Sequence, residues 1–305
     1  MLKTENITRP KNIDDLLDPE LVARISRLDY TSKRIFSGKI RGERRSKKRG
    51  ESVEFADHRP YVSGDDMRHI DWNIYGRLDR LFLKLFLEEE DLSLSLVIDC
   101  SGSGDCGEPN KFLYMQKLAM AFGYIGLVNF NRVSVTAIGE GGVLSAVRDL
   151  RGRRRTQELG NWMCLQSPQG GLDFREACKR IALTRRGKGV MIILSDFFIK
   201  EGYQDGLRLL VGHGFDIFVM QVLSPQEINP PITGDLRLKD IEDGDMAEVT
   251  ISAPLLKRYK ANLAAYTDQL RQFCARREIM HLTVSTETEI ETLIIDYMRK
   301  KGLLR

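Results

Sequence analysis

The spacing of apolar residues changes along the chain and divides it into two regions. Leucine, isoleucine and valine recur at near-helical intervals through residues 12–29, which predicts an amphipathic helix there. Residues 52–87 instead contain short apolar stretches and turn signals, and the alternating run Leu81–Phe86 is typical of a strand. We therefore expect residues 1–89 to hold a helix, an arm and a small β-containing module.

Continuous apolar runs alternate with helical patterns from Leu92 onward. Such runs are typical of strands buried on both faces of a parallel sheet, and they lie at 190–194 and 215–222. Further strands are predicted at 92–98, 132–138 and 281–284. Helical spacing predicts helices near 111–125, 173–185 and 203–211, and from Pro254 onward. The fold class predicted for residues 90–305 is therefore α/β, a doubly wound, mostly parallel sheet with helices on both faces.

Local signals refine this picture at four places. Asn110 is a suitable N-cap for the first helix of the α/β region, and Val143–Val147 follows a glycine pair that predicts a hairpin. Residues 224–252 are rich in Pro, Gly and Asp and predict an insertion with β-hairpin character. Thr286–Glu289 matches a capping box and predicts that a terminal helix begins there.

Composition places the protein among globular proteins. Charged residues make up 30% and hydrophobic residues 42%, and no stretch reads as a membrane span. The N-terminus shows no apolar stretch followed by small residues, so we expect no secretory signal and a cytoplasmic location. Five cysteines without Cys-x-x-Cys spacing and four dispersed histidines argue against a disulfide framework and against a zinc enzyme.

The positive charge is concentrated in one arm. Residues 33–49 hold nine basic residues and one acidic residue, a net charge of +8, which leaves −4 for the rest of a chain whose net charge is +4. Such an arm can bind nucleic acid or an anionic membrane surface, dock on an acidic protein, or remain solvated. Because it lacks interleaved aromatic residues, we expect at most weak, sequence-independent binding to nucleic acid.

Carboxylates and hydroxyls follow two of the predicted strands. Ligands of open parallel sheets collect at the carboxyl ends of the strands, where this chain places Asp99, Ser101, Ser103 and Asp196. These are hard oxygen ligands of the kind that Mg²⁺ prefers. The alternative is that both aspartates only cap the turns or helices that follow them.

Enzymatic alternatives use the same loop. Gly102–Gly107 spells Gly-x-Gly-x-x-Gly between a strand and a helix, but Asp99 and Asp105 place negative charge where a pyrophosphate would lie, and Glu108-Pro109 disrupts the helix start. The chain has no P-loop motif, and Ser101 replaces the second carboxylate of an Asp-x-Asp phosphatase. A hydrolase or nucleotide-binding enzyme that uses the crevice at Asp99 and Asp196 remains the rival interpretation.

Two sequence motifs carry a family resemblance. The segments Arg49–Phe55 and Arg59–Trp72 resemble the signature of the domain-of-unknown-function 58 family, and the resemblance extends over most of the chain. The Asp-x-Ser-x-Ser loop is similar to the metal-ion-dependent adhesion site of von Willebrand factor type A domains. The resemblance implies a type A-like α/β fold in a bacterial or archaeal protein, often encoded beside MoxR-type AAA+ ATPases.

The resemblance also implies a set of metal ligands. It places a Mg²⁺ ion on Asp99, Ser101, Ser103 and Asp196. The threonine expected in a Gly-Gly-Thr-Asp loop is replaced by Leu172, whose side chain cannot ligate a cation. Metal binding would therefore depend on Asp173 or on water as the substitute ligand.

A second cluster of candidate residues precedes the α/β region. It mixes opposite charges with aromatic side chains and consists of Arg59, Tyr61, Asp65, Asp66, Arg68, Asp71 and Trp72. One interpretation is an ion-pair network, because charges brought inside a protein need partners. The other is a docking surface, because Tyr, Trp and Arg are common anchors of protein interfaces.

Taken together, these features predict a non-enzymatic protein-interaction module. The chain shows no nucleophile with an adjacent base, but it presents a carboxylate-hydroxyl loop at a sheet edge. We expect it to act as an adaptor or accessory subunit, with Mg²⁺ as the possible cofactor and a MoxR-type AAA+ ATPase, suggested only by the resemblance, as the partner.

Overall fold

The computed structural model describes residues 7–30, 54–87, 92–184, 189–239, 246–300 and 302–304. The chain forms two compact units, a larger one of residues Met1–Gly38 with Leu92–Arg305 and a smaller one of residues Lys39–Asp91. The basic arm 33–49 lies outside the described residues.

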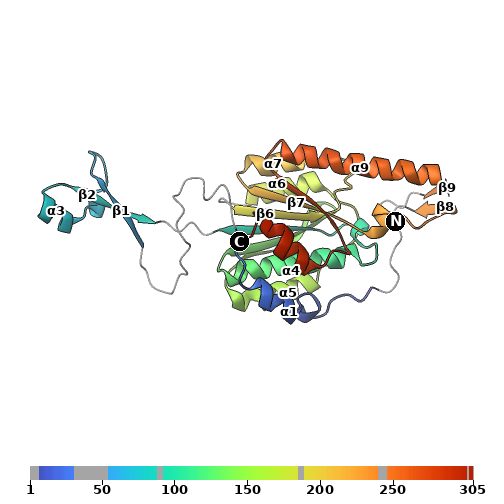
Figure 1. Cartoon of the computed structure of the whole chain (residues 1–305), viewed down its shortest axis with the longest axis horizontal. Coiled ribbons are helices and arrows are strands. Elements are labelled where there is room, and N and C mark those ends of the chain that lie inside the picture. Colours follow the sequence, from blue (N-terminus) through green and yellow to red (C-terminus); the bar gives the residue numbers. More distant parts are fainter. Residues whose placement is uncertain are drawn as a thin grey trace. The chain divides into compact units, whose positions relative to one another are not determined.

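A six-stranded sheet is the centre of the larger unit (Figure 1). Its strands are β3 (Ser93–Asp99), β4 (Arg132–Gly139), β5 (Gly142–Leu150), β6 (Gly189–Ser195), β7 (Asp216–Leu223) and β10 (Met280–Ser285). They lie in the order β10-β7-β6-β3-β4-β5, and every neighbouring pair is parallel except the hairpin of β4 and β5. This arrangement confirms the predicted fold class and the predicted hairpin.

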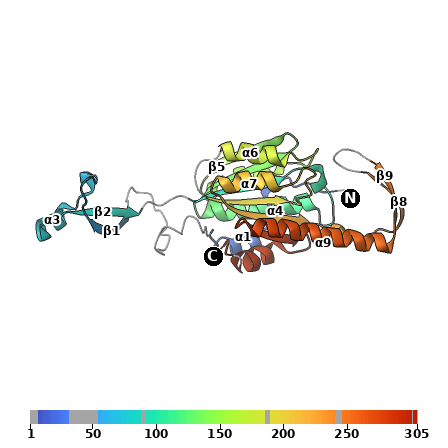
Figure 2. The ribbon, with the colours of Figure 1, turned by 90° about the horizontal axis from the view of Figure 1, so that it is seen from above.

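Helices cover both faces of this sheet, as Figures 1 and 2 show. One face carries α1 (Pro19–Ile25), α4 (Lys111–Val128) and α5 (Thr156–Cys164), whereas the other carries α6 (Phe174–Thr184), α7 (Gln204–Gly212) and α9 (Ala253–Ala275). The shorter helical segments are η1 (Ile13–Asp15), η3 (Gly102–Gly104), η4 (Arg153–Arg155), α8 (Pro225–Ile228), α10 (Ile290–Thr292) and η5 (Leu293–Met298).

Alternation along β3 explains why two cores form. Leu94, Leu96 and Ile98 pack into the core beneath α4, while Val97 points to the opposite core with α6 and α7. All four side chains are buried, so the apolar residues of this strand contribute to both cores.

The order of the strands creates a crevice beside β3. The chain leaves β3 toward β4 on one side and later returns to β6 on the other side, so the connections diverge at the carboxyl end of β3. Such a switch point is where open α/β sheets bind ligands. It brings the residues after β3 and β6 to one edge.

The N-terminal segment packs on the larger unit. Tyr30 is fully buried, its hydroxyl donates to the Phe122 carbonyl across 2.7 Å, and its backbone forms a bridge with Leu304. The predicted division at residue 89 placed this segment with the small β module instead. The predicted helix over 12–29 is also shorter, because Pro19 at the first turn of α1 starts a new helix after η1.

The predicted capping box at Thr286–Glu289 does not form. The Thr286 amide donates to the Leu223 carbonyl, which continues the pairing of β10 with β7, and α10 begins only at Ile290. The predicted insertion does contain a hairpin, made by β8 (Gly234–Lys239) and β9 (Met246–Ile251). Sheet pairing therefore prevails over the local helix signal at Thr286.

The smaller unit contains a two-stranded antiparallel sheet and short helices. Its strands are β1 (Glu54–Pro60) and β2 (Phe82–Leu87), and between them lie η2 (Met67–His69) and α3 (Trp72–Leu78). Asp71 caps α3 by accepting the amide N–H groups of Asn73 and Ile74. The structure confirms the predicted β-containing character of this region.

Candidate functional site

Asp99 is buried at the carboxyl end of β3 and is held from two sides. Its Oδ1 accepts the Ser101 amide N–H across 2.9 Å, and its Oδ2 accepts the hydroxyl of Ser195 across 2.5 Å. Ser195 is the last residue of β6, so these bonds join the ends of two neighbouring strands. The carboxylate is thereby fixed in one orientation.

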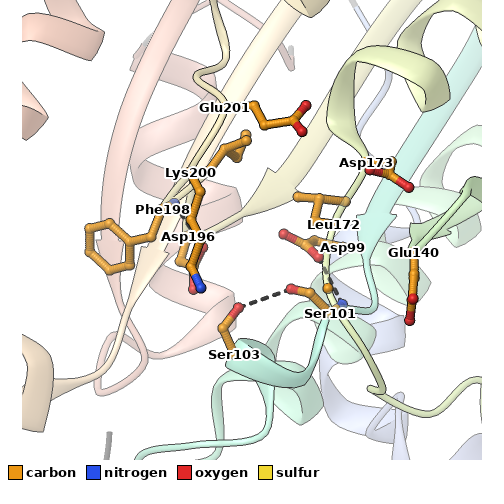
Figure 3. A pocket seen from close by; sticks show the side chains of 12 residues that line it. Asp99, Ser101, Ser103, Glu140, Leu172, Asp173, Asp196, Phe198, Lys200 and Glu201 are labelled. Carbon is orange, nitrogen blue, oxygen red and sulfur yellow. Dashed lines mark hydrogen bonds between the residues drawn. The ribbon is translucent and has the colours of Figure 1, made fainter. Parts of the chain in front are cut away.

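The loop after β3 presents two hydroxyls beside this carboxylate. The Oγ atoms of Ser101 and Ser103 lie 2.9 Å apart, and the Gly102 amide donates to the Gly170 carbonyl across 2.8 Å. Figure 3 shows Asp99, Ser101 and Ser103 grouped in the pocket. The loop therefore brings together three of the residues predicted as metal ligands.

Asp196 supplies the second carboxylate, directly after β6. Its Oδ1 accepts a hydrogen bond from the Phe198 amide N–H across 3.0 Å, and its Oδ2 accepts one from the Lys111 ammonium across 2.6 Å. Lys111 is fully buried and also donates to Glu227 Oε1 across 2.7 Å. The side of Asp196 away from the pocket is thus occupied by a lysine.

A pocket of about 290 Å³ is lined by Asp99, Ser101, Ser103 and Asp196. Its apolar lining consists of Leu172, Phe198 and Ile199, and Lys200 also lines it. Five carboxylates face it, those of Asp99, Glu140, Asp173, Asp196 and Glu201. The chemistry of the lining therefore favours a cation.

Burial perturbs the ionisation of the central groups. Burial, followed by the nearby carboxylate of Asp196, raises the pKa of Asp99 to about 6, although hydrogen bonds from Ser195 and Ser101 oppose the shift. Burial alone would lower the pKa of Lys111, but the carboxylates of Asp196 and Glu227 reverse this and raise it above the ordinary lysine range. A positive charge in the pocket would favour the ionised form of Asp99.

The hydroxyl pair fits one edge of a Mg²⁺ coordination shell. Mg²⁺ holds six oxygens octahedrally at about 2.0–2.1 Å, so neighbouring ligands lie about 2.9 Å apart. The two serine Oγ atoms have this separation. Within the described ranges, no three His, Cys, Asp or Glu side chains gather to hold a metal by themselves, so the serine hydroxyls would be needed.

Asp173 lines the pocket and also forms hydrogen bonds with the turn between β4 and β5. Its Oδ2 accepts the Gly141 amide N–H across 2.5 Å, and its own amide donates to the Gly139 carbonyl across 3.0 Å. These bonds hold the turn between β4 and β5. Leu172 places its apolar side chain in the pocket instead of the hydroxyl that a threonine would bring (Figure 3).

The glycine-rich loop is built unlike a dinucleotide site. Asp105 forms an ion pair with Arg9 at 2.7 Å, and α4 begins only at Lys111, whose side chain points to the buried carboxylates. The residues that line the pocket include no histidine, cysteine or tyrosine.

The charged cluster of the smaller unit is largely paired within that unit. Arg59 holds Asp65 with two bonds of 2.7 Å each, and Arg68 holds Asp66 across 2.7 Å. The Arg68 side chain lowers the pKa of Asp66 to about 2. The predicted pairing of opposite charges is therefore present among these four residues.

Asp71 belongs to the same cluster and has basic neighbours on two strands. Its Oδ2 lies 2.9 Å from Nε2 of His58 and 3.4 Å from Nζ of Lys84. Hydrogen bonding to His58, opposed by burial, lowers the pKa of Asp71 to about 2. These contacts fasten the N-cap of α3 to the β1–β2 sheet.

Several apolar side chains of this unit are exposed beside its charged residues. Trp72 is 63% exposed and meets Tyr75 edge to face at 6.0 Å between ring centroids, whereas Tyr61 is partly buried. Further exposed apolar residues of the unit are Val62, Met67 and Leu78. Exposed apolar side chains therefore lie beside the charged residues of the predicted docking surface.

The sequence analysis missed Lys111 and Glu227, and it also missed Glu140, Ser195 and Glu201. Lys111 is the first residue of α4, where the positive end of the helix dipole disfavours a cation. A lysine directly after the N-cap Asn110 is unfavourable unless a carboxylate lies nearby, so its position in the sequence could have indicated such a partner. Nothing local marks Glu227, which sits in the capping box of α8.

Comparisons with known proteins extend these observations. Residues 57–288 match the model of a family described as "Protein of unknown function DUF58". The uncharacterized protein Rv1480 of Mycobacterium tuberculosis (strain ATCC 25618 / H37Rv) is 26% identical over 257 residues, which are 83% of this chain and 80% of that protein. The uncharacterized protein Mb1516 of Mycobacterium bovis has the same identity and coverage.

Two solved structures align with part of the chain. The conserved hypothetical protein BatB from Bacteroides thetaiotaomicron aligns with 68% of this chain and 98% of its own, at 11% identity and a TM-score of 0.42. The SpRpn10 VWA domain aligns with 68% of this chain and 95% of its own, at 12% identity and a TM-score of 0.40. Among the described helices, none combines the length and the apolar character that crossing a membrane requires.

Proposed function

The chain belongs to the DUF58 family of proteins of unknown function, and we propose that it is a non-enzymatic interaction module whose pocket binds a protein partner together with Mg²⁺. One observation carries the proposal. The hydroxyls of Ser101 and Ser103 lie 2.9 Å apart next to the fixed carboxylate of Asp99, which is a suitable arrangement for neighbouring ligands of Mg²⁺.

The ligands of the cation would come from two strand ends. Asp99, Ser101 and Ser103 follow β3, and Asp196 follows β6, with water or Asp173 in the place that Leu172 leaves without a donor. Bound Mg²⁺ would supply a Lewis-acidic centre that accepts an oxygen ligand from a partner. Ser195 and Lys111 would hold the two carboxylates in position.

The partner that we propose is a MoxR-type AAA+ ATPase, for which this chain would act as adaptor or accessory subunit. This part of the proposal comes from the family resemblance. The physical support is that the chain has no P-loop of its own and that Trp72 and Tyr75 offer an exposed aromatic pair typical of interface anchors.

Calorimetric titration with MgCl₂ tests the cation site. We expect saturable binding by the wild type and at least a tenfold loss in Asp99→Ala, with Asp205→Ala as a control because Asp205 lies exposed on α7. Absence of binding at millimolar Mg²⁺, or equal binding by Asp99→Ala, would contradict the metal proposal.

The enzyme alternative needs a separate test. Hydrolase and nucleotide-binding screens with the purified chain should give no turnover that depends on Asp99. Turnover that Asp99→Ala abolishes would overturn the non-enzymatic interpretation.

Weak binding of nucleic acid by the basic arm 33–49 remains a second candidate function, favoured by the arm's net charge of +8. Counterion release would make such binding fall steeply with added salt. Tight binding of one defined sequence at physiological salt would contradict our expectation.

A further inference from the structure

The buried charges of the larger unit gather at one place. Among its described residues, the charged side chains that are buried are Asp99, Lys111, Asp196 and Glu227. Lys111 lies between two of the carboxylates, 2.6 Å from Asp196 Oδ2 and 2.7 Å from Glu227 Oε1. Its Nζ also lies 5.9 Å from the centroid of the Phe198 ring.

The charges of this group do not cancel. Three carboxylates face one ammonium group, so the group carries a net charge of −2 when its members are ionised. Buried charge is costly unless it is paired. One divalent cation at the pocket side of Asp99 and Asp196 would bring the sum of these four buried charges to zero. The other charged residues that line the pocket, Glu140, Asp173, Lys200 and Glu201, are not buried.

We propose that Lys111 sets the charge selectivity of the pocket. Its positive charge balances one of the three buried carboxylates and leaves a net charge of −2, which a single divalent cation neutralises. The inference rests on the proposed function, because it assumes that the pocket binds Mg²⁺. It adds that Glu227, which is bonded to Lys111 and does not line the pocket, contributes to the affinity through its charge.

A purely mechanical role for Lys111 is the alternative. In that case the lysine positions Asp196, and the charge of Glu227 is of no consequence for the cation. Charge-matched variants separate the two. Lys111→Met leaves a net charge of −3, Glu227→Gln leaves −1, and the double variant Lys111→Met/Glu227→Gln restores the wild-type value of −2.

Calorimetric titration of the full chain with MgCl₂ and with TbCl₃ tests the inference. We expect Glu227→Gln to bind Mg²⁺ at least about tenfold more weakly than the wild type, because it removes one buried negative charge near the cation. The double variant should bind Mg²⁺ within about threefold of the wild type, and Lys111→Met should shift the preference toward Tb³⁺ by at least about tenfold.

The possible outcomes are distinct. If the wild type binds no Mg²⁺, the proposed function fails and the inference fails with it. If the wild type binds Mg²⁺ but Glu227→Gln binds equally well, or the double variant loses affinity, the charge inference alone is wrong. Should Lys111→Met fail to fold, Glu227→Gln and the double variant still decide, since circular dichroism can verify their folding.

Discussion

The hydroxyl of Ser195 donates to Asp99 Oδ2 across 2.5 Å and so connects the ends of β6 and β3. The same Oγ accepts the Phe197 amide N–H across 2.9 Å, which shapes the turn after β6. Ser195 is fully buried, so neither bond can be replaced by bulk water. The Ser195 side chain therefore both orients Asp99 in the candidate site and joins the ends of two strands of the sheet.

Removal of this hydroxyl should lower the stability of the larger unit. Ser195→Ala takes away a hydrogen bond to a buried carboxylate, and such bonds contribute about 1.5–3 kcal/mol. We expect a loss of this size in the free energy of unfolding, measured by urea denaturation in the presence of a chelator. Ser103→Ala is the control, since its hydroxyl bonds to a neutral hydroxyl, and equal losses in the two variants would contradict this assignment.

Replacement of Leu172 tests the missing ligand. Leu172→Thr adds a hydroxyl at the pocket, and we expect it to raise the affinity for Mg²⁺ by about tenfold, or about 1.4 kcal/mol. Leu172→Val is the matched control because valine has nearly the shape of threonine but no hydroxyl. Equal affinities of the two variants in calorimetry would show that position 172 does not reach the cation.

His281 should make the stability of the larger unit sensitive to acid. Burial, followed by the positive charge of Arg271, lowers the pKa of His281 to about 4, from an ordinary value near 6.5. Below pH 6.5 His281 is therefore protonated in the unfolded chain but still neutral in the folded chain. The free energy of unfolding consequently falls as the pH drops toward 4. The slope is at most about 1.4 kcal/mol per pH unit, and partial exposure of the ring keeps it below this limit.

His281→Leu isolates this contribution. The difference in unfolding free energy between wild type and variant should change in favour of the variant as the pH is lowered from 7 to 4. Urea denaturation at several pH values measures it. A difference that stays constant over this range would show that His281 titrates normally in the folded protein.

Two glycines test how closely α4 packs on the sheet. A Cβ at Gly126 would lie 2.6 Å from Cγ2 of Val133 and 3.0 Å from Cδ2 of Leu94, whereas nothing lies within 4 Å of a Cβ at Gly212 in α7. We expect Gly126→Ala to cost about 1–3 kcal/mol in unfolding free energy, because a packed core tolerates extra volume poorly. Gly212→Ala should be neutral or stabilising by up to about 1 kcal/mol, and a similar change in both variants would contradict the packing argument.

The sequence predicted the fold well where burial alone decides the structure. The five predicted strands all formed, and the apolar run at 190–194 became β6, which is buried along its whole length. Asn110 became the N-cap of α4, where it accepts the Leu113 amide N–H. The capping box at Thr286 failed because the sheet retained its amide N–H, which is a long-range contact that no local motif records.

The candidate site was predicted only in part, for the same reason. The position of Asp99, Ser101, Ser103 and Asp196 after two strands predicted that they lie close together, and all four line the pocket. Their role as metal ligands stays a prediction. Lys111 and Glu227 are separated by 116 positions in the chain, so their contact could not be inferred from spacing. The charge balance of the pocket consequently could not be predicted from the sequence and follows only from the three-dimensional structure.

The central claim is that the pocket binds a protein partner with the help of a divalent cation. The most direct measurement is the affinity of the immobilised chain for a purified MoxR-type AAA+ ATPase from the same organism, in Mg²⁺ and in EDTA, for wild type, Asp99→Ala and Asp205→Ala. We predict binding by the wild type and by Asp205→Ala in Mg²⁺, and at least a tenfold loss both in EDTA and in Asp99→Ala. No binding by the wild type, or binding that neither EDTA nor Asp99→Ala weakens, would contradict this account.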